Sequence, residues 1–289
     1  MNTESNKVLL VGIGETGRGA IQIIRKNKVE GISTLGVEEE SQLNLPYAKS
    51  IQEAELVILV ADLGSKKDDS LTLQAAKLAK ENGKIVAAFV TTPRIFEGEK
   101  KIMHALETAM ELKSEVDASL IINKENFTNL PEDGYSPAEL VDSLVLVEDR
   151  IAGAIQDMMA LITKGGAINI DFEDLKLIIV QSGTFAIESG IGYKANRIRD
   201  AIEMALSSPM MKTCDIFTSR KVLIKVLSPK KSPISMDEVN ILADFIGKFP
   251  PYVDVKWGEG TADDDDLLSV IILASGFDVK LPKKIVELC

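Results

Sequence analysis

The sequence predicts an α/β protein with a parallel sheet in its first half and a second α/β domain, with a mixed sheet, in its second half. Short apolar runs alternate with helical stretches between residues 7 and 123, which is typical of parallel strands joined by helical crossovers. A long helical pattern then separates this part from a second series of strands and helices. The 289 residues, 45% hydrophobic and 27% charged, suit two domains of ordinary size.

The first half contains five predicted strands. KVLLV (7–11) is a buried strand that ends in the glycine turn GIGETGRGAIQIIRK, which opens a helix. The elements that follow are a strand over 34–37, a strand over 56–61, a helix over 71–83, a strand over 84–92, a helix after 93–101 and a strand over 118–123. The turn-rich segment 124–137, KENFTNLPEDGYSP, predicts no regular structure.

A long helix is predicted from about Ala138 to Thr163, ending at the glycine stop KGG. One buried stripe recurs along it at helical spacing: Val147, Ile151, Ile155, Met158 and Ile162. Beyond it, strands are predicted over 175–189, 220–228, 252–260 and 266–277, and helices over 195–208 and 235–249. We therefore divide the chain into an N-terminal α/β domain (1–137), a central helix (138–166) and a C-terminal domain (167–289).

Composition narrows the classes of function. A net charge of −11 and a pI near 4.8 disfavour nucleic acid and anionic membranes as partners. Cys214, Cys289 and the single His104, which lies in an amphipathic helix, predict neither a metal site nor histidine-based catalysis. The N-terminus has no basic leader and no apolar run is long enough to span a membrane, so we expect a cytoplasmic protein without direct membrane insertion.

A glycine pattern after the first strand allows one reading as a dinucleotide-binding enzyme. Gly12, Gly14 and Gly17 fit G-x-G-x-x-G, and Glu38 lies near the end of the second strand, where such folds place a ribose-binding acid. The pattern is short and arises often by chance. The second half offers no constellation for hydride transfer, so this reading is an alternative only.

A more specific match covers almost the whole chain. The segments VGIGETGRGAI, AELVILVADLG, VTTPRIFEGEKK, VDASLIINKENF, ALITKGGAINIDFEDLK, ANRIRDAIEMALSSPMM and SVIILASGF follow one another in the order expected of the FtsZ branch of the tubulin superfamily. The chain resembles that branch, INIDFEDLK and ALSSPMM being the most diagnostic segments. The resemblance implies a nucleotide-binding domain, a central helix, a C-terminal domain and subunits that stack head to tail.

In the family, a loop after the central helix presses into the nucleotide of the next subunit, and two of its acids position the attacking water. The matching residues here are Asn169, Asp171 and Asp174, so the resemblance implies an interface role for them and a catalytic role if activity remains. An alternative is that Asp171 and Asp174 only provide acids at the start of the next helix.

The family's phosphate-binding signature, G-G-G-T-G-T-G, aligns with GSKKDDS at 64–70, where Gly64 is kept and Ser65 replaces the next glycine. The lost glycines let backbone approach phosphate, and the new aspartates add like charge. The ribose-contacting pair aligns with Glu97, which is kept, and Lys101, where the family has arginine. The guanine-covering aromatic aligns with Leu144 and the base-binding asparagine with Glu148, while Asp149 keeps the following acid.

Other departures agree with a dismantled GTP site. The first loop keeps its three glycines but carries Glu15 and Arg18, with Gly19 where asparagine is usual, and the segment between Val37 and Ala54 is too short for the family's γ-phosphate loop. The sequence stops at Cys289, so we expect no adaptor-binding C-terminal peptide.

We therefore expect an FtsZ-like cytoskeletal, cell-division-related protein that assembles with itself or with an FtsZ-like paralogue and whose binding and hydrolysis of GTP are lost or weak. No cofactor is firmly expected, and GTP or GDP with magnesium would bind only if the site is still competent. The main alternative is an active GTPase that forms protofilaments.

Overall fold

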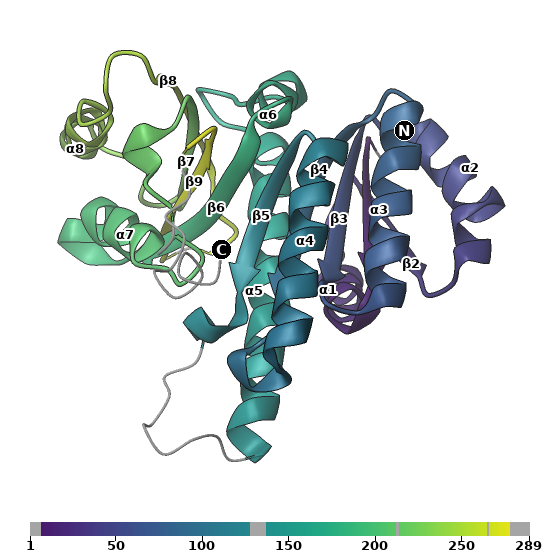
Figure 1. Ribbon diagram of the computed structural model, residues 1–289. Coiled ribbons are helices and arrows are strands. Elements are labelled where there is room, and N and C mark those ends of the chain that lie inside the picture. The colour runs from purple at the N-terminus through teal and green to yellow at the C-terminus, as the bar shows by residue number, and fades with distance from the viewer. Residues whose placement is uncertain (1–6, 128–136, 212–213, 265, 278–289) are drawn as a thin grey trace. The chain divides into compact units, whose positions relative to one another are not determined.

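The computed structural model describes residues 7–127, 137–211, 214–264 and 266–277, with the side chains of the helix 137–163 described from residue 147 onward. The chain divides into two compact units, which are described one at a time. The first comprises residues 1–159 and 179–183, and the second comprises 160–178 and 184–289. The elements of both units are labelled in Figure 1.

The sheet of the first unit is parallel throughout its described strands. Its strand order is β2-β1-β3-β4-β5, and β1 lies between β2 and β3 with Val8 opposite both Ile32 and Leu56. Apolar residues fill both faces of the inner strands, as expected for a sheet that is covered by helices on both sides. The strands are β1 (Val8–Ile13), β2 (Ile32–Val37), β3 (Leu56–Asp62), β4 (Ile85–Thr92) and β5 (Ala118–Asn123).

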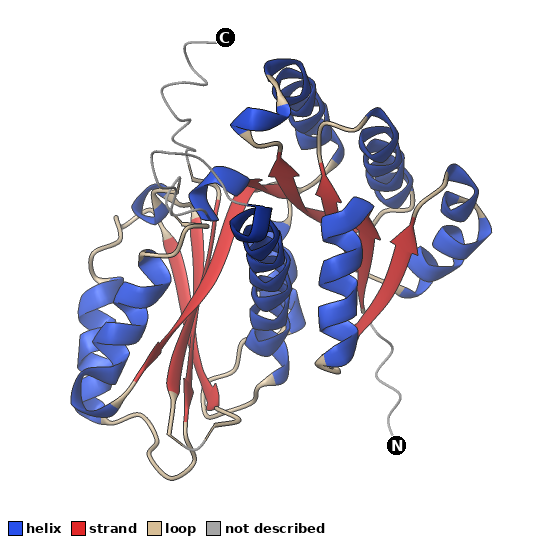
Figure 2. Ribbon diagram, turned by 90° about the horizontal axis from the view of Figure 1, so that it is seen from below, coloured by secondary structure: helices blue, strands red, loops and turns tan. Residues whose placement is uncertain are grey.

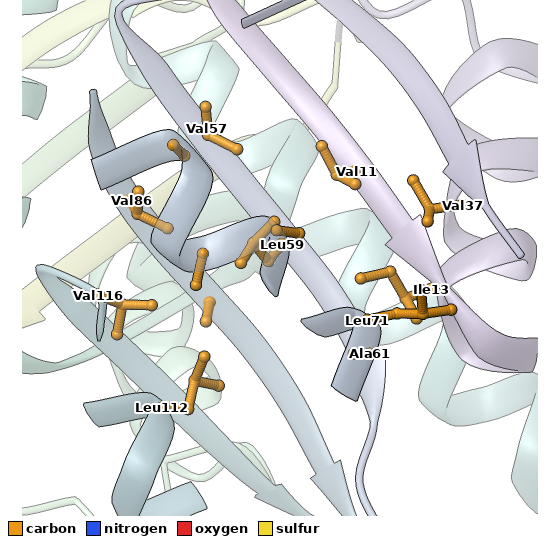
Figure 3. Packing of buried hydrophobic residues seen from close by; sticks show 14 of the residues in the cluster. Val11, Ile13, Val37, Val57, Leu59, Ala61, Leu71, Val86, Leu112 and Val116 are labelled. Carbon is orange, nitrogen blue, oxygen red and sulfur yellow. The ribbon is translucent and has the colours of Figure 1, made fainter. Parts of the chain in front are cut away.

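Helices α2, α3 and α4 pack on one face of this sheet. Figure 3 shows part of this core, where Val11 and Leu59 of the strands lie with Leu71 of α3 and Leu112 of α4. The buried hydroxyl of Tyr47 in α2 donates to the carbonyl of Ala75 in α3 at 2.6 Å. The first unit's helices are α1 (Gly14–Lys26), α2 (Leu45–Glu53), α3 (Lys66–Glu81), α4 (Glu99–Glu115) and most of α5 (Pro137–Thr163), with single 3-10 turns η1 (Glu40–Leu43), η2 (Ile95–Glu97) and η3 (Lys124–Phe127).

Helix α1 contacts β1 and β3 so closely that two glycines are required there. A Cβ on Gly12 would overlap the carbonyl of Gly17, and a Cβ on Gly17 would lie 2.6 Å from the carbonyl of Val60. Two of the three glycines of the G-x-G-x-x-G pattern therefore have a packing role that is independent of any ligand.

The second unit has a mixed sheet, as predicted. Its strand order is β6-β9-β7-β8, with β9 antiparallel to β6 and β7 and with β7 parallel to β8. Figure 2 shows the strands of each unit with their flanking helices. The elements are β6 (Gly183–Gly192), β7 (Lys221–Ser228), β8 (Asp254–Thr261), β9 (Leu268–Ser275), α6 (Phe172–Ile179), α7 (Arg197–Leu206) and α8 (Met236–Ile246), with 3-10 turns η4 (Lys194–Asn196) and η5 (Ile216–Thr218).

Two predicted elements differ from the structure. The run 175–179, LKLII, was expected to be strand but belongs to helix α6, Val180 lies in a turn, and β6 begins only at Gly183. A short apolar run does not separate helix from strand by itself, and here an N-terminal capping arrangement starts a helix. The helix predicted over 71–83 begins earlier, because α3 spans Lys66–Glu81.

The long helix predicted from about Ala138 to Thr163 spans Pro137–Thr163. The turn-rich segment 124–137 begins with η3, and its residues 128–136 lie outside the described residues. Among the helices that the structure describes, none combines the length and the apolar character that a membrane span requires.

Candidate functional site

A pocket of about 340 Å³ lies in the first unit where β3, β4 and β5 end. The carboxyl ends of parallel strands are the usual position of ligand sites in sheets of this kind. Charged side chains of both signs surround the opening. Those that line it are Glu15, Asp62, Asp68, Arg94, Glu97, Lys101 and Lys124.

Asp62, the last residue of β3, is the centre of the hydrogen-bond network. Its Oδ2 accepts the backbone N–H of Thr16 at 2.9 Å, and its Oδ1 accepts the Thr16 hydroxyl at 2.7 Å. The same Oδ1 accepts the hydroxyl of Thr91 at 2.6 Å and the ammonium of Lys124 at 2.6 Å. One carboxylate thus joins the ends of β3, β4 and β5 to the first turn of α1.

These partners keep Asp62 ionised. Burial by itself would raise the pKa of Asp62, but the charge and hydrogen bond of Lys124, together with the Thr91 and Thr16 hydroxyls, lower the pKa below its usual value. The carboxylate lies at the N-terminus of α1, where free backbone amides favour a negative charge. It therefore holds a position at which such folds commonly bind an anion.

A second buried carboxylate stabilises the turn between β3 and α3. Both oxygens of Asp69 accept the backbone N–H of Gly64, at 3.0 and 3.1 Å, and Oδ2 also accepts the hydroxyl of Thr108 at 3.2 Å. His104 Nε2 lies 3.1 Å from the same oxygen. Burial raises the pKa of Asp69, and these bonds offset the increase only in part. The stretch that aligns with the glycine signature therefore forms the start of helix α3, with Ser65 at the N-cap position and with the Asp69 carboxylate bonded to the Gly64 N–H.

A third carboxylate, that of Asp68, lies near Asp62 beside the glycine turn at Gly14. Gly14 has φ +72, a conformation that favours glycine, and a Cβ placed there would lie 3.4 Å from Asp68 Oδ2 and 3.6 Å from Asp62 Oδ2. Both oxygens therefore face the same small region above Gly14.

Glu97 and Lys101 form an ion pair at the pocket wall, one turn apart. Glu97 Oε1 also accepts the backbone N–H of Arg94 at 2.8 Å. Burial opposes ionisation of Glu97, but the bonds to Lys101 and to the Arg94 backbone lower its pKa. The two residues predicted as a ribose-contacting pair thus lie together, and they bind each other.

At the α5 side of the first unit, Glu148 packs against α1. A Cβ on Gly19 would overlap the Glu148 carboxylate, so the missing side chain at Gly19 provides the space for it. Burial raises the pKa of Glu148 to about 6, and the charges of Glu15, Asp62 and Asp149 add to the effect. Asp149 is exposed, and the side chain of Leu144 lies outside the described residues.

The predicted interface residues lie in the second unit, around the start of α6. Asp171 Oδ1 accepts the N–H of Asp174 at 2.9 Å, and Asp174 Oδ2 accepts the N–H of Asp171 at 3.0 Å, a reciprocal arrangement that starts the helix. Asp174 also bonds Lys256 at 2.5 Å; burial opposes its ionisation, but this bond lowers its pKa. Asn169 Oδ1 accepts the N–H of Gly166 at 3.0 Å. All three side chains therefore have partners within their own chain.

The structure brings Ser65, Glu97 and Lys101 to the pocket wall, with Gly14 and Gly64 beside them. Gly12 and Gly17 serve helix packing, as described above. Sequence reasoning missed Asp62 and Lys124, the pair at the centre of the pocket. The available signal was an acid and a lysine at the ends of two strands of one parallel sheet.

Comparison with known proteins finds relatives in one group. The chain is 29% identical over 236 residues to the cell division protein FtsZ of Porphyromonas gingivalis, a match that covers 81% of this chain and 50% of that protein. It is 27% identical over 285 residues to the cell division protein FtsZ of Buchnera aphidicola subsp. Schizaphis graminum, covering 97% of this chain and 72% of that protein. This chain therefore spans half the length of the first relative. No family model matches the sequence.

Solved structures have the same fold. An FtsZ dimer of Methanocaldococcus jannaschii aligns with a TM-score of 0.79 at 21% identity, covering 96% of this chain and 89% of that chain. Protofilaments of TubZ from Bacillus thuringiensis serovar israelensis, in a GDP form, align with a TM-score of 0.72 at 13% identity, covering 98% of this chain and 87% of that chain. At these identities the likeness establishes the fold, an FtsZ/tubulin-like arrangement of a parallel and a mixed sheet.

Proposed function

Because the chain belongs in sequence and in fold to the FtsZ/tubulin superfamily, we propose that it is an FtsZ-like cytoskeletal protein that assembles head to tail, with itself or with a paralogue, and whose GTP binding and hydrolysis are lost or weak. The observation that carries the proposal is the Asp62 carboxylate, which accepts both the backbone N–H and the hydroxyl of Thr16 at the start of α1. We infer that this internal anion holds the position where the family would hold phosphate.

The energetic argument follows from charge. At a separation of about 4 Å, two like charges repel by about 4 kcal/mol at the effective dielectric of a protein surface. A triphosphate above Gly14 would meet Asp62 and Asp68 together, and the ammonium of Lys124, which lines the pocket, is already bound to Asp62. A micromolar ligand has only about 8 kcal/mol of binding free energy in total. The pocket therefore does not suit a triphosphate.

The signature turn argues in the same direction. The Gly64 N–H, which a phosphate would need as a donor, is bonded to the Asp69 carboxylate, and α3 begins at Lys66 where a glycine-rich loop would have to stay open. At the base end, Glu148 takes the space beside Gly19. Each of these groups must move before a nucleotide can occupy the pocket.

Surfaces suited to assembly persist beside these changes. Ile95 and Phe96, 65% and 54% exposed, lie next to the pocket of the first unit. In the second unit, Ile168 and Leu177 are exposed around the loop that carries Asp171. We propose that these two surfaces meet in successive subunits, which is the head-to-tail contact that the family resemblance implies. We also propose a cytoplasmic location, as the sequence predicts.

An active GTPase is the second candidate. The observation that favours it is the pocket itself, which remains about 340 Å³ in volume and keeps the Glu97–Lys101 pair on its wall. In this case Asp171 and Asp174 would have to act on a neighbouring subunit although both are engaged in starting α6.

Two measurements separate the candidates. The first is calorimetric titration of GTP with magnesium into the purified chain, together with mass analysis of any nucleotide that co-purifies. We expect neither low-micromolar binding nor co-purified guanine nucleotide. Low-micromolar binding, with phosphate release that disappears in an Asp171→Ala, Asp174→Ala double variant, would establish the GTPase instead.

The second measurement is sedimentation of the nucleotide-free chain over a range of concentrations. We expect larger species in the wild type, and their loss in Asp171→Lys, because a lysine there places the wrong charge at the proposed contact. Glu203→Lys on α7, an exposed position on a different element of the second unit, is the matched control and should sediment like the wild type. An unchanged distribution for Asp171→Lys would show that this loop is not the contact.

A further inference from the structure

A buried lysine that bonds to none of the described residues lies in strand β7 of the second unit. Lys225 is in the middle of β7, its side chain is fully buried, and its ammonium bonds to none of the described residues. Burial lowers the pKa of Lys225, and the nearby charge of Glu259 offsets only part of this effect. Lys221, four residues earlier on the same strand, by contrast donates to the carbonyl of Leu177 at 2.5 Å.

Two glycines of β8 make room for this lysine and for the chain that covers it. A Cβ on Gly260 would lie 3.1 Å from Lys225 Cε and 2.7 Å from the carbonyl oxygen of Lys164. A Cβ on Gly258 would lie 2.8 Å from the carbonyl oxygen of Ile168. The segment Lys164–Ile170, here called the covering loop, therefore lies directly against β8 beside the buried amine.

Glu259 holds the covering loop on β8. Its carboxylate Oε2 accepts the backbone N–H of Ala167 at 2.8 Å, and its own N–H donates to the carbonyl of Ile168 at 2.8 Å. A further polar attachment, from Lys164 to Asp263, is a surface pair in which Asp263 is 85% exposed, and such pairs contribute little. The same carboxylate thus secures the loop and is the charge that attracts Lys225.

We propose that the covering loop is a two-position latch in which Ala167 and Lys225 compete for the Glu259 carboxylate. In the position observed, the carboxylate bonds the loop and leaves a buried ammonium without a partner, an arrangement that costs free energy. When the loop lifts, Glu259 can pair with Lys225, and this new bond offsets part of the cost of opening. The latch does not depend on nucleotide or on the function proposed above, and any partner that docks on the loop would find it easy to displace.

Amide hydrogen exchange of the full chain tests the latch. The reporters are the amides of Ala167 and Glu259, which bond across the loop and β8. Lys225→Met removes the competing ammonium and keeps an unbranched apolar side chain, so exchange at both amides should slow by roughly tenfold, the equivalent of one net hydrogen bond. Lys221→Met, which removes an amine that already has a partner, is the matched control and should leave both rates unchanged.

Glu259→Gln gives a second constraint. Exchange at Ala167 should become faster in this variant than in the wild type. Adding Lys225→Met to Glu259→Gln should not slow this exchange, because the carboxylate for which Ala167 and Lys225 compete is gone. A folded Lys225→Met variant with unchanged or faster exchange at Ala167 would overturn the proposal.

A measurement on the wild type keeps the test valid if Lys225→Met does not fold. An amine-reactive reagent should label Lys225 through local opening of the loop, at a rate that does not change with urea below the unfolding transition. Labelling of Lys225 only in step with global unfolding would contradict a loop that opens on its own.

Discussion

Replacement of Asp62 by asparagine should destabilise the first unit more than any other single change of comparable size at the pocket. The asparagine has nearly the same shape, but one of its two terminal atoms is an NH₂ donor. It would face either the Thr16 N–H or the Lys124 ammonium, which are both donors themselves. The variant therefore tests whether the ionised carboxylate, and not its volume, organises the strand ends.

The magnitude follows from burial. The Asp62 and Lys124 side chains are 19% and 11% exposed, so removal of the negative charge leaves a nearly buried ammonium without its counter-charge. Breaking such pairs costs about 3 to 5 kcal/mol, and partial exposure points to the lower end, about 3 kcal/mol. Because partners lower the pKa of Asp62, this contribution is complete at neutral pH and is lost as the pH falls through the folded-state pKa.

Urea unfolding at pH 7, followed separately for the two units, gives the measurement. Asp62→Asn, Lys124→Met and the double variant form a cycle whose coupling should be about 2 kcal/mol. A loss below about 1 kcal/mol in Asp62→Asn would refute the reasoning, because the carboxylate would then contribute no more than an ordinary surface acid.

The same residue tests the idea of an internal anion. Asp62→Ala leaves the Thr16 amide and Lys124 facing an empty position, so inorganic phosphate should stabilise this variant and not the wild type. The gain should be about 1.4 kcal/mol at a phosphate concentration ten times its Kd. Equal responses of the two proteins to phosphate would show that Asp62 does not occupy an anion position.

Two further predictions concern other ionised groups. The pKa of Glu148 is about 6 in the folded state, above its ordinary value of 4.5, so stability present below pH 4.5 is lost as the pH rises through 6. Glu148→Gln should therefore be more stable than the wild type at pH 7, by about 1 kcal/mol after allowance for partial exposure. The two proteins should be equally stable near pH 4.5. A stability difference that stays constant between pH 4.5 and pH 7 would contradict this prediction. In the second unit, Arg197 donates to Glu238 through Nε and Nη2 at 2.6 and 3.0 Å. Arg197→Lys should therefore lower the free energy of unfolding by about 2 kcal/mol, measured by urea titration. A change within about 0.5 kcal/mol would show that the two-pronged guanidinium geometry is not needed.

The sequence by itself predicted the fold class and the resemblance to the FtsZ branch of the tubulin superfamily. Alternating apolar runs and helical stretches indicate a parallel sheet because each strand must bury both faces, and this depends on local composition alone. The long stripe from Val147 to Ile162 predicted the central helix to within one residue of its start. Local pattern failed at 175–179, where the mostly apolar run LKLII suits a strand as well as a helix and the Asp171–Asp174 capping arrangement decides between them.

The candidate site was decided by tertiary structure. The sequence indicated that the glycine signature at 64–70 was lost, but not what replaced it. The carboxylate of Asp62 and the ammonium of Lys124 are 62 residues apart in the chain and 2.6 Å apart in the fold. They meet because β3 and β5 end at the same edge of one parallel sheet, with β4 between them. No local pattern records such a meeting, since hydrogen bonds between strand ends depend on sheet order, and sheet order is a property of the assembled fold.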